Sequence, residues 1–171
     1  LGDVYKRQIP LDPYYLTWKA RLSGFEAKFI SLAGEINSSM PHYVVTLISD
    51  ALNEEGKCVK GSRILILGAA YKKNVGDVRE SPAIEIMESL IARGAEMYYT
   101  DPYVPSLVVG DRVFESIPLE AGSLKAMDCV VVVTNHDSFN YDLVSANARL
   151  IVDTRNAMRN TRNVSGRIVK L

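Results

Sequence analysis

The sequence lacks an excess of charge of either sign. Its 171 residues include 20 Lys and Arg and 20 Asp and Glu, which gives a formal net charge of +0 at pH 7. Without a net positive charge, the chain has no overall field that would attract nucleic acid or an anionic membrane. We therefore expect no nucleic acid and no membrane among its partners.

Long apolar runs and close pairs of cysteines are also missing. The longest apolar run, residues 129–133, has the length of a β-strand and is far short of the roughly 20 residues that cross a bilayer. No signal peptide is visible. The two cysteines, Cys58 and Cys129, have neither the close spacing nor the His neighbours of a metal site or a redox dithiol. These absences favour a cytoplasmic protein without a bound metal.

The remaining composition is that of a globular chain, with 47% hydrophobic and 23% charged residues. Between residues 25 and 52, apolar residues recur at spacings of three and four. This period predicts one long amphipathic helix, or two in series, with a stop at Gly56. Because Pro41 falls inside the pattern, we expect a kink or a break near Met40. Residues 9–56 would thus form a helical arm that is too thin to bury its own apolar stripe. The arm needs a partner, either the rest of this chain or a second copy.

From residue 62 onward, short apolar runs alternate with helical stretches, and this rhythm predicts an α/β domain with a parallel sheet at residues 60–171. The helix after the first strand has clear punctuation, with Ser81 as N-cap, Pro82 at its first position and Gly94 just past its end. The predicted strands are residues 63–67, 96–100, 129–133 and 150–152.

The first strand-to-helix loop, residues 68–81, is the place where such sheets bind ligands. The dinucleotide fingerprint G-x-G-x-x-G is absent, because Ala70 and Lys73 stand where the second and third glycines belong. The loop instead has two cations near its start and Arg79 near its end, close to a helix N-terminus that favours anions. This pattern fits a site for a phosphorylated ligand, with an ordinary solvated loop as the alternative.

Residues 68–72 (GAAYK), 77–82 (DVRESP) and 9–16 (IPLDPYYL) resemble the nucleotide-sugar 6-dehydrogenases. That family oxidises UDP-glucose, UDP-N-acetylhexosamines or GDP-mannose to uronic acids with NAD. The sequences of residues 9–16 and 34–41 resemble the members that act on UDP-N-acetylhexosamines more than those that act on UDP-glucose. The resemblance implies that residues 60–171 are a Rossmann-like, UDP-sugar-binding domain and that residues 9–56 end the central helical region. It also implies a homodimer through that arm and a C-terminal fragment without the N-terminal NAD domain.

The resemblance further assigns roles to single residues. Tyr71, Lys72 and Arg155 match residues that contact the UDP-sugar substrate. Arg79 matches an arginine that reaches toward the NAD pyrophosphate. The other interpretation of the two arginines is an ion pair, of Arg79 with Glu80 or of Arg155 with Asp153, that only orders the loops.

The family's nucleophile is missing from this chain. In the family a Gly-Gly-His-Cys motif precedes the position of Ile9, and its Cys forms a thiohemiacetal and then a thioester. Here that position is Gln8, so we expect no turnover. Asp12 matches an aspartate that helps to activate water, although Asp12 with Pro13 also fits a simple turn. Residues 1–8 look like the translation of a sequencing-library adapter, and we hypothesise that they replace native sequence.

Two other classes of protein deserve comparison. A stand-alone nucleotide-sugar-binding module without catalysis would share the same loop. A flavodoxin-like signalling receiver would need an acidic cluster at the strand ends, and Asp101 and Asp153 are too isolated for one. Asp101 with Pro102 fits a turn better than a ribose contact. His136 fits a loop that holds Phe139 against the core better than it fits a catalytic base.

Overall fold

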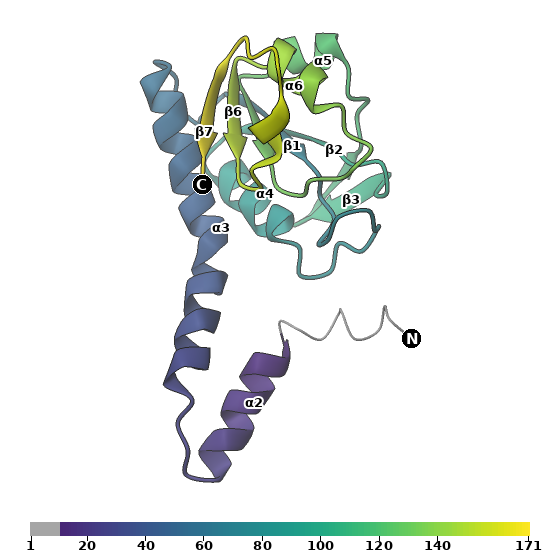
Figure 1. Ribbon diagram of the computed structural model, residues 1–171. Coiled ribbons are helices and arrows are strands. Elements are labelled where there is room, and N and C mark those ends of the chain that lie inside the picture. The colour runs from purple at the N-terminus through teal and green to yellow at the C-terminus, as the bar shows by residue number, and fades with distance from the viewer. Residues whose placement is uncertain (1–10) are drawn as a thin grey trace. The chain divides into compact units, whose positions relative to one another are not determined.

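The computed structural model describes residues 11–171, and the chain divides into two compact units between Met40 and Pro41. The first unit contains helix α2 (Leu11–Leu22) and the first turns of helix α3 (Lys28–Glu54). The second unit contains the remainder of α3 and all of the strands (Figure 1). Gln8 and the rest of residues 1–8 lie outside the described residues.

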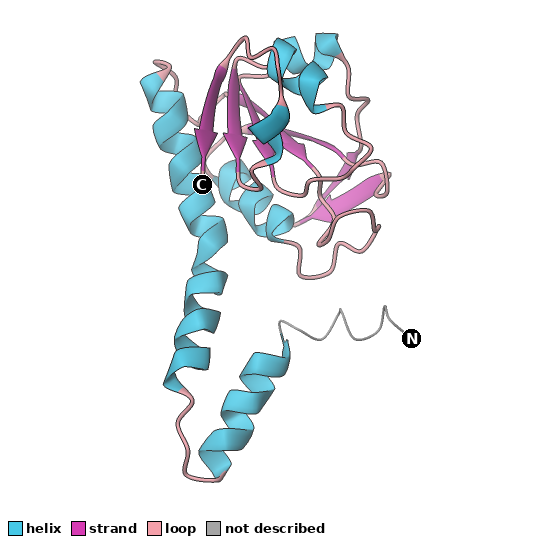
Figure 2. Ribbon diagram, viewed as in Figure 1, coloured by secondary structure: helices cyan, strands magenta, loops and turns pink. Residues whose placement is uncertain are grey.

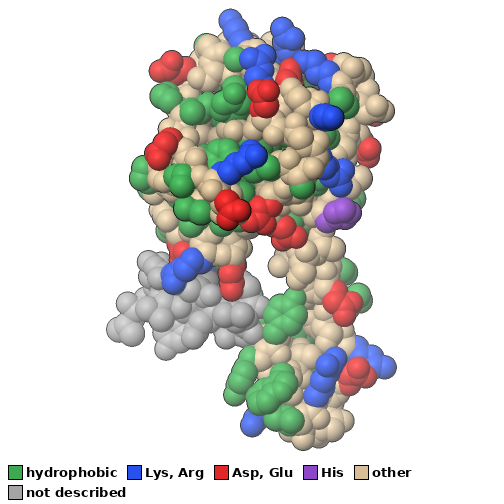
Figure 3. Space-filling model, turned by 180° about the vertical axis from the view of Figure 1, so that it is seen from behind, with side chains coloured by type: hydrophobic (Ala, Val, Ile, Leu, Met, Phe, Trp, Pro, Cys, Tyr) green, Lys and Arg blue, Asp and Glu red, His purple; other side chains and the backbone are tan. Residues whose placement is uncertain are grey.

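In the first unit, α2 packs against the start of α3. The Tyr14 hydroxyl lies 2.9 Å from the Ser38 Oγ, and a Cβ at Gly34 would come within 3.1 Å of the Tyr14 ring, so the absent side chain leaves room for it. Hydrophobic side chains are exposed on these helices (Figure 3). They include Tyr15, Leu16, Trp18 and Leu22 on α2 and Phe29, Leu32 and Ile36 on α3, and Phe25 is exposed in the link between the two helices.

Helix α3 is continuous through Pro41, so the helix does not break near Met40, whereas a kink there stays a prediction. In the turn before the proline, the Ser39 hydroxyl donates to the carbonyl of Ile36 over 2.8 Å. The helix ends at Glu54, and Gly56 has the left-handed φ of +70° expected of a C-terminal stop. Although α3 has 27 residues, none of the helices that the structure describes is both long and apolar enough to cross a membrane.

The second unit is built on a parallel sheet with the strand order β2-β1-β5-β6-β7 (Figure 2). The sheet strands are β1 (Arg63–Leu67), β2 (Glu96–Thr100), β5 (Cys129–Val132), β6 (Leu150–Asp153) and β7 (Arg167–Lys170). The helices are α4 (Pro82–Ala92), α5 (Ala121–Ala126), α6 (Tyr141–Asn147) and the 3-10 helix η1 (Ala157–Asn160). A separate hairpin, β3 (Ser106–Val109) with β4 (Arg112–Glu115), completes the unit. The predicted Rossmann-like α/β fold is thereby confirmed, while β7 and the hairpin were not predicted.

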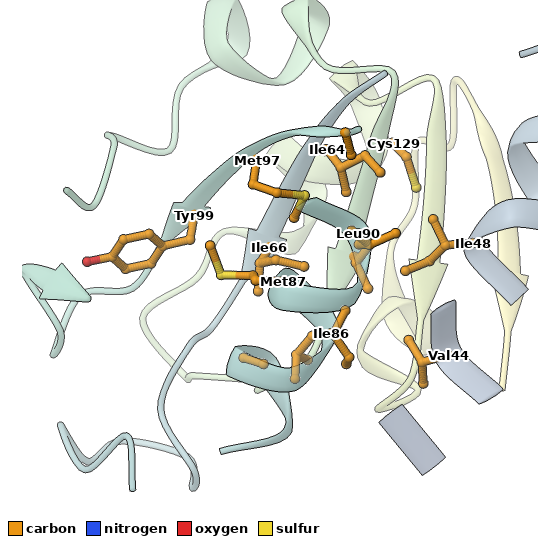
Figure 4. Packing of buried hydrophobic residues seen from close by; sticks show 14 of the residues in the cluster. Val44, Ile48, Ile64, Ile66, Ile86, Met87, Leu90, Met97, Tyr99 and Cys129 are labelled. Carbon is orange, nitrogen blue, oxygen red and sulfur yellow. The ribbon is translucent and has the colours of Figure 1, made fainter. Parts of the chain in front are cut away.

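Hydrophobic cores cover both faces of the sheet. On one face, Ile64 and Ile66 of β1 pack with α4 and with Val44 and Ile48 of α3 (Figure 4). On the other face, Leu65 and Leu67 pack with α5, α6 and η1. Successive residues of β1 point to opposite faces, so each strand contributes to both cores. Because the second half of α3 is part of the first core, the compact unit begins at Pro41 and not near residue 60.

Helix α4 has the capping that its sequence predicted. Ser81 has extended backbone angles and its hydroxyl accepts from the N–H of Ala83 over 3.3 Å, and Pro82 is the first helical residue. Gly94 follows the helix with a φ of +85°. These caps fix where the loop after β1 ends.

Candidate functional site

The strand order places a topological switch point at the carboxyl ends of β1 and β5. The chain leaves β1 through α4, which packs on one face of the sheet, and leaves β5 through α6, which packs on the other. Neighbouring strands whose connections depart to opposite faces form the topological switch point where open α/β sheets bind ligands. The loops that border it here are residues 68–81 after β1 and residues 133–140 after β5.

The two loops meet closely at Gly68. This residue has a φ of +84°, and a Cβ there would lie 2.2 Å from the carbonyl oxygen of Thr134. The Thr134 hydroxyl donates to the carbonyl of Ala70 over 2.6 Å. Glycine is required at this position because any side chain would adopt a strained backbone conformation and would collide with the neighbouring backbone.

Asp101, at the end of β2, organises the start of the β1–α4 loop. Its carboxylate is buried, and Oδ2 accepts the backbone N–H groups of Ala69 and Ala70 over 2.8 and 2.9 Å. Oδ1 accepts the N–H of Tyr103 over 2.8 Å, which is the turn that the sequence favoured. Oδ2 also lies 3.0 Å from Nε2 of His136. The carboxylate is therefore surrounded by donors from the protein itself.

His136 is fully buried and links the same loop to β5. Its Nδ1 accepts a hydrogen bond from the backbone N–H of Asn74 over 2.8 Å, so the ring carries its proton on Nε2. This Nε2–H donates a hydrogen bond to Asp101. The imidazole lies between Tyr103 and Phe139, with ring centroids 5.0 and 5.2 Å away. Phe139 is buried in the second core, as expected for this loop, whereas Asp101 was not predicted as the partner of His136.

The tip of the β1–α4 loop is held by Asp137 of the loop after β5. Asn74, with a φ of +61°, donates its amide to Asp137 Oδ2 over 2.7 Å and accepts the Asp137 N–H over 3.0 Å. Lys73 forms an ion pair with the same carboxylate. The hydrogen bonds from Lys73 and then from Asn74 hold the pKa of Asp137 below its ordinary value of 3.8.

Tyr71 and Lys72 lie in the middle of this fastened loop. Both side chains are partly buried, and the Lys72 Nζ lies 5.2 Å from the centroid of the Tyr71 ring. The backbone N–H of Tyr71 donates to the carbonyl of Asp77 over 2.7 Å. An aromatic ring and an ammonium group are thus presented together at the switch point.

Arg79 is exposed and forms a two-point ion pair with Asp77. Its Nε and one terminal nitrogen donate to the two carboxylate oxygens over 3.0 and 2.9 Å, and the hydrogen bond to Asp77 raises the pKa of the guanidinium. The ion pair considered from the sequence involved Glu80, so the partner differs. Fork geometry selects Asp77 because both of its oxygens can be reached at once.

Arg155 follows β6 at the same edge of the sheet and is exposed. The buried carboxylate of Asp153 accepts the backbone N–H groups of Arg155, Ala157 and Met158 over 3.0, 3.0 and 2.8 Å. Asp153 therefore holds the turn on which Arg155 lies by hydrogen bonds to backbone N–H groups. It does not form an ion pair with the Arg155 guanidinium. The side chain of Asp12, at the start of α2, lies outside the part that the structure describes.

The carboxylates at the strand ends accept hydrogen bonds from the loop backbone. Asp101 and Asp153 each bind several backbone N–H groups, which is not the exposed acidic cluster that a signalling receiver uses to hold Mg²⁺. Within residues 11–171, no group of three or more His, Cys, Asp or Glu side chains is arranged to hold a metal ion. This edge of the sheet also carries the cationic side chains of Lys72 and Arg155.

Known proteins with related sequences share this domain. Residues 65–160 match the UDP-binding domain of the UDP-glucose/GDP-mannose dehydrogenase family, over more than half of the chain. The chain is 34% identical over 131 residues to a UDP-N-acetyl-D-mannosamine dehydrogenase of Methanococcus maripaludis. It is 30% identical over 138 residues to a UDP-N-acetyl-D-glucosamine 6-dehydrogenase of Salmonella typhi. These matches cover 77% and 81% of this chain but 28% and 32% of the relatives, so the chain spans about a third of their length.

Solved structures agree with the sequence matches. A UDP-D-ManNAc dehydrogenase from Pyrococcus horikoshii matches with a TM-score of 0.76 at 26% identity. The match covers 94% of this chain and 37% of that enzyme's chain. A UDP-glucose dehydrogenase from Pyrobaculum islandicum has a TM-score of 0.72 at 26% identity, with coverages of 92% and 36%. The chain therefore belongs to the UDP-glucose/GDP-mannose dehydrogenase family, and its α/β unit contains the family's UDP-binding domain.

Proposed function

We propose that this chain is the nucleotide-sugar-binding part of an NAD-dependent 6-dehydrogenase that acts on a UDP-N-acetylhexosamine. The relatives named above, which act on UDP-N-acetylmannosamine and UDP-N-acetylglucosamine, support that substrate class. The observation that carries the proposal is the β1–α4 loop, which holds an aromatic ring and an ammonium group at the switch point of the sheet. In the complete enzyme the C6 hydroxyl of the sugar would be oxidised to a carboxylate in two hydride transfers.

Within this site, Tyr71, Lys72 and Arg155 are the proposed ligands of the nucleotide sugar. The Lys72 ammonium supplies a mobile positive charge for the diphosphate or a sugar oxygen, and Tyr71 supplies a flat surface with a polar tip. The Arg155 guanidinium, from the neighbouring strand end, supplies a forked donor. These three groups replace the backbone amides with which glycine-rich loops bind phosphate.

NAD is proposed as the hydride acceptor, held mainly by residues outside the domain described here. Of the described residues, we assign only Arg79 to it, as a charged donor toward the pyrophosphate. That contact would have to form beside the ion pair with Asp77. The first loop lacks the glycines with which a dinucleotide fold approaches a pyrophosphate.

We also propose that this chain by itself turns nothing over. Gln8 stands at the nucleophile position, so a thioester cannot form there, and the proposed water-activating Asp12 has no thiol beside it. The chain's two cysteines do not replace it. Burial raises the pKa of Cys129 within β5, and Cys58 precedes β1, at the opposite edge of the sheet from the site.

The helical arm is proposed to form a homodimer in the cytoplasm. Phe25, Phe29 and Leu32 are more than half exposed on the first unit, at 66%, 84% and 52%. Large apolar side chains clustered on one helical hairpin are the kind of surface that a second copy covers.

Binding of UDP to the 171-residue chain tests the site. We expect Lys72→Ala and Arg155→Ala each to weaken the dissociation constant about tenfold or more, since hydrogen bonds to charged groups contribute about 1.5–3 kcal/mol. Lys125→Ala and Arg149→Ala are matched controls, because both are exposed cations at the amino-terminal edge of the sheet. Titration calorimetry gives the four values. Equal effects at both edges would refute the site, and NADH formation from UDP-N-acetylhexosamine and NAD would refute the expected inactivity.

A further inference from the structure

The most deeply buried polar pair of this unit lies directly beneath the proposed site. Asp101 is 3% exposed and His136 is 0% exposed, and the roles proposed above use neither. Burying a carboxylate beside an imidazole is costly unless every polar atom is satisfied. Here each side-chain atom of the pair that can accept or donate has a partner within 3.0 Å.

The partners of this pair bracket Tyr71 and Lys72. Asp101 accepts the N–H groups of Ala69 and Ala70, immediately before Tyr71 in the chain, and His136 accepts the N–H of Asn74, just after it. The ends of three strands, β1, β2 and β5, meet in this cluster. The backbone on both sides of the two proposed ligand residues is thus held by one buried unit.

Resting on the proposed function, we propose that Asp101 and His136 are positioning residues of the nucleotide-sugar site. They hold residues 69–74 in the binding conformation before the ligand arrives. A loop that is ordered in advance does not lose its conformational freedom on binding, and affinity gains accordingly.

The chemistry of the cluster requires these two residue types. The Asn74 N–H is a donor, so His136 must present a bare Nδ1 to it and carry its proton on Nε2. The carboxylate of Asp101 then accepts a hydrogen bond from this Nε2–H. It also accepts hydrogen bonds from the backbone N–H groups of Ala69, Ala70 and Tyr103. A carboxylate accepts from all four donors, whereas an amide in its place would direct its own N–H at one of them. Loss of Asp101 leaves the buried N–H groups of Ala69 and Ala70 without their acceptor, and loss of His136 leaves the part-buried N–H of Asn74 without its acceptor.

The test is UDP titration of the 171-residue chain and a His136→Phe variant. Phenylalanine keeps an aromatic ring between Tyr103 and Phe139 and removes both hydrogen bonds. We expect the dissociation constant for UDP to rise about tenfold in the folded variant, because binding must then order the loop. The control is Val144→Ala, which opens the core on α6 and should lower stability while leaving UDP affinity unchanged.

A double-mutant cycle with Lys72→Ala separates positioning from general loss of structure. If His136 acts through the loop that carries Lys72, His136→Phe should weaken UDP binding much less in the Lys72→Ala background than in the wild-type background. Equal fold-changes in both backgrounds, or wild-type affinity of folded His136→Phe, would overturn the inference alone. Wild-type affinity of Lys72→Ala would overturn the proposed function, and this inference with it.

Hydrogen exchange in the unmodified chain provides a test that needs no variant. The backbone amides of Ala69, Ala70 and Asn74 should exchange as slowly as that of Leu65 in the centre of β1, since the buried pair holds them. Faster exchange of these three amides through local opening would show that the loop is not held before binding, and the inference would fail.

Discussion

Substituting Gly68 by alanine should destabilise the second unit more than any ordinary loop substitution. An L-residue at a φ of +84° lies in the left-handed region, and this conformation costs about 1–2 kcal/mol of folding free energy. The new Cβ would also lie 2.2 Å from the carbonyl oxygen of Thr134 and 2.8 Å from its carbonyl carbon, so the carboxyl ends of β1 and β5 must separate. Overpacking of this kind costs about 1–3 kcal/mol, and the two effects sum to about 2–5 kcal/mol.

Two other glycines separate the two effects. Gly56→Ala introduces only the backbone strain, because φ is +70° and nothing lies within 4 Å of its Cβ. Gly166→Ala introduces only the collision, because its φ is not positive and its Cβ would lie 2.2 Å from the carbonyl oxygen of Ala148. The free energy of unfolding of all three variants can be measured in urea. If Gly68→Ala lost no more stability than Gly56→Ala, the inferred close contact between the two loops would be refuted.

Two further predictions concern the carboxylates at this edge. Asp153→Asn should cost about 1–3 kcal/mol in urea unfolding and weaken UDP binding, because an amide cannot accept from all three N–H groups that carry the Arg155 turn; wild-type values of both would contradict this role. Because the pKa of Asp137 is lowered in the folded chain, its contribution to stability is complete above the unfolded pKa and is lost as the pH falls through the folded one. Lys73→Ala should therefore move the pKa of Asp137 back toward 3.8, as followed by carbon-13 NMR titration, and an unchanged pKa would exclude Lys73 as the main cause.

Much of the second unit could be predicted from the sequence because its signals are local. The apolar runs at residues 63–67, 96–100 and 129–133 became strands, and Ser81, Pro82 and Gly94 bound helix α4 as their residue types require. The absence of the glycine fingerprint, and the residues of the loop after the first strand, were likewise enough to indicate the family. Capping, periodicity and motifs involve residues a few positions apart, so a linear reading detects them.

Tertiary structure decided the features that depend on distant residues. Helix α3 continues through Pro41, and its second half joins the core of the α/β unit, because Val44 and Ile48 find partners on the sheet and on α4. Asp101 and His136, 35 positions apart, become a pair only when parallel pairing brings the ends of β2, β1 and β5 to one edge. The sequence by itself determined which side chains stand in the loops after β1 and β6 and are proposed to bind a nucleotide sugar. The fold decided which backbone holds them in place, since that depends on hydrogen bonds between segments that share no local signal.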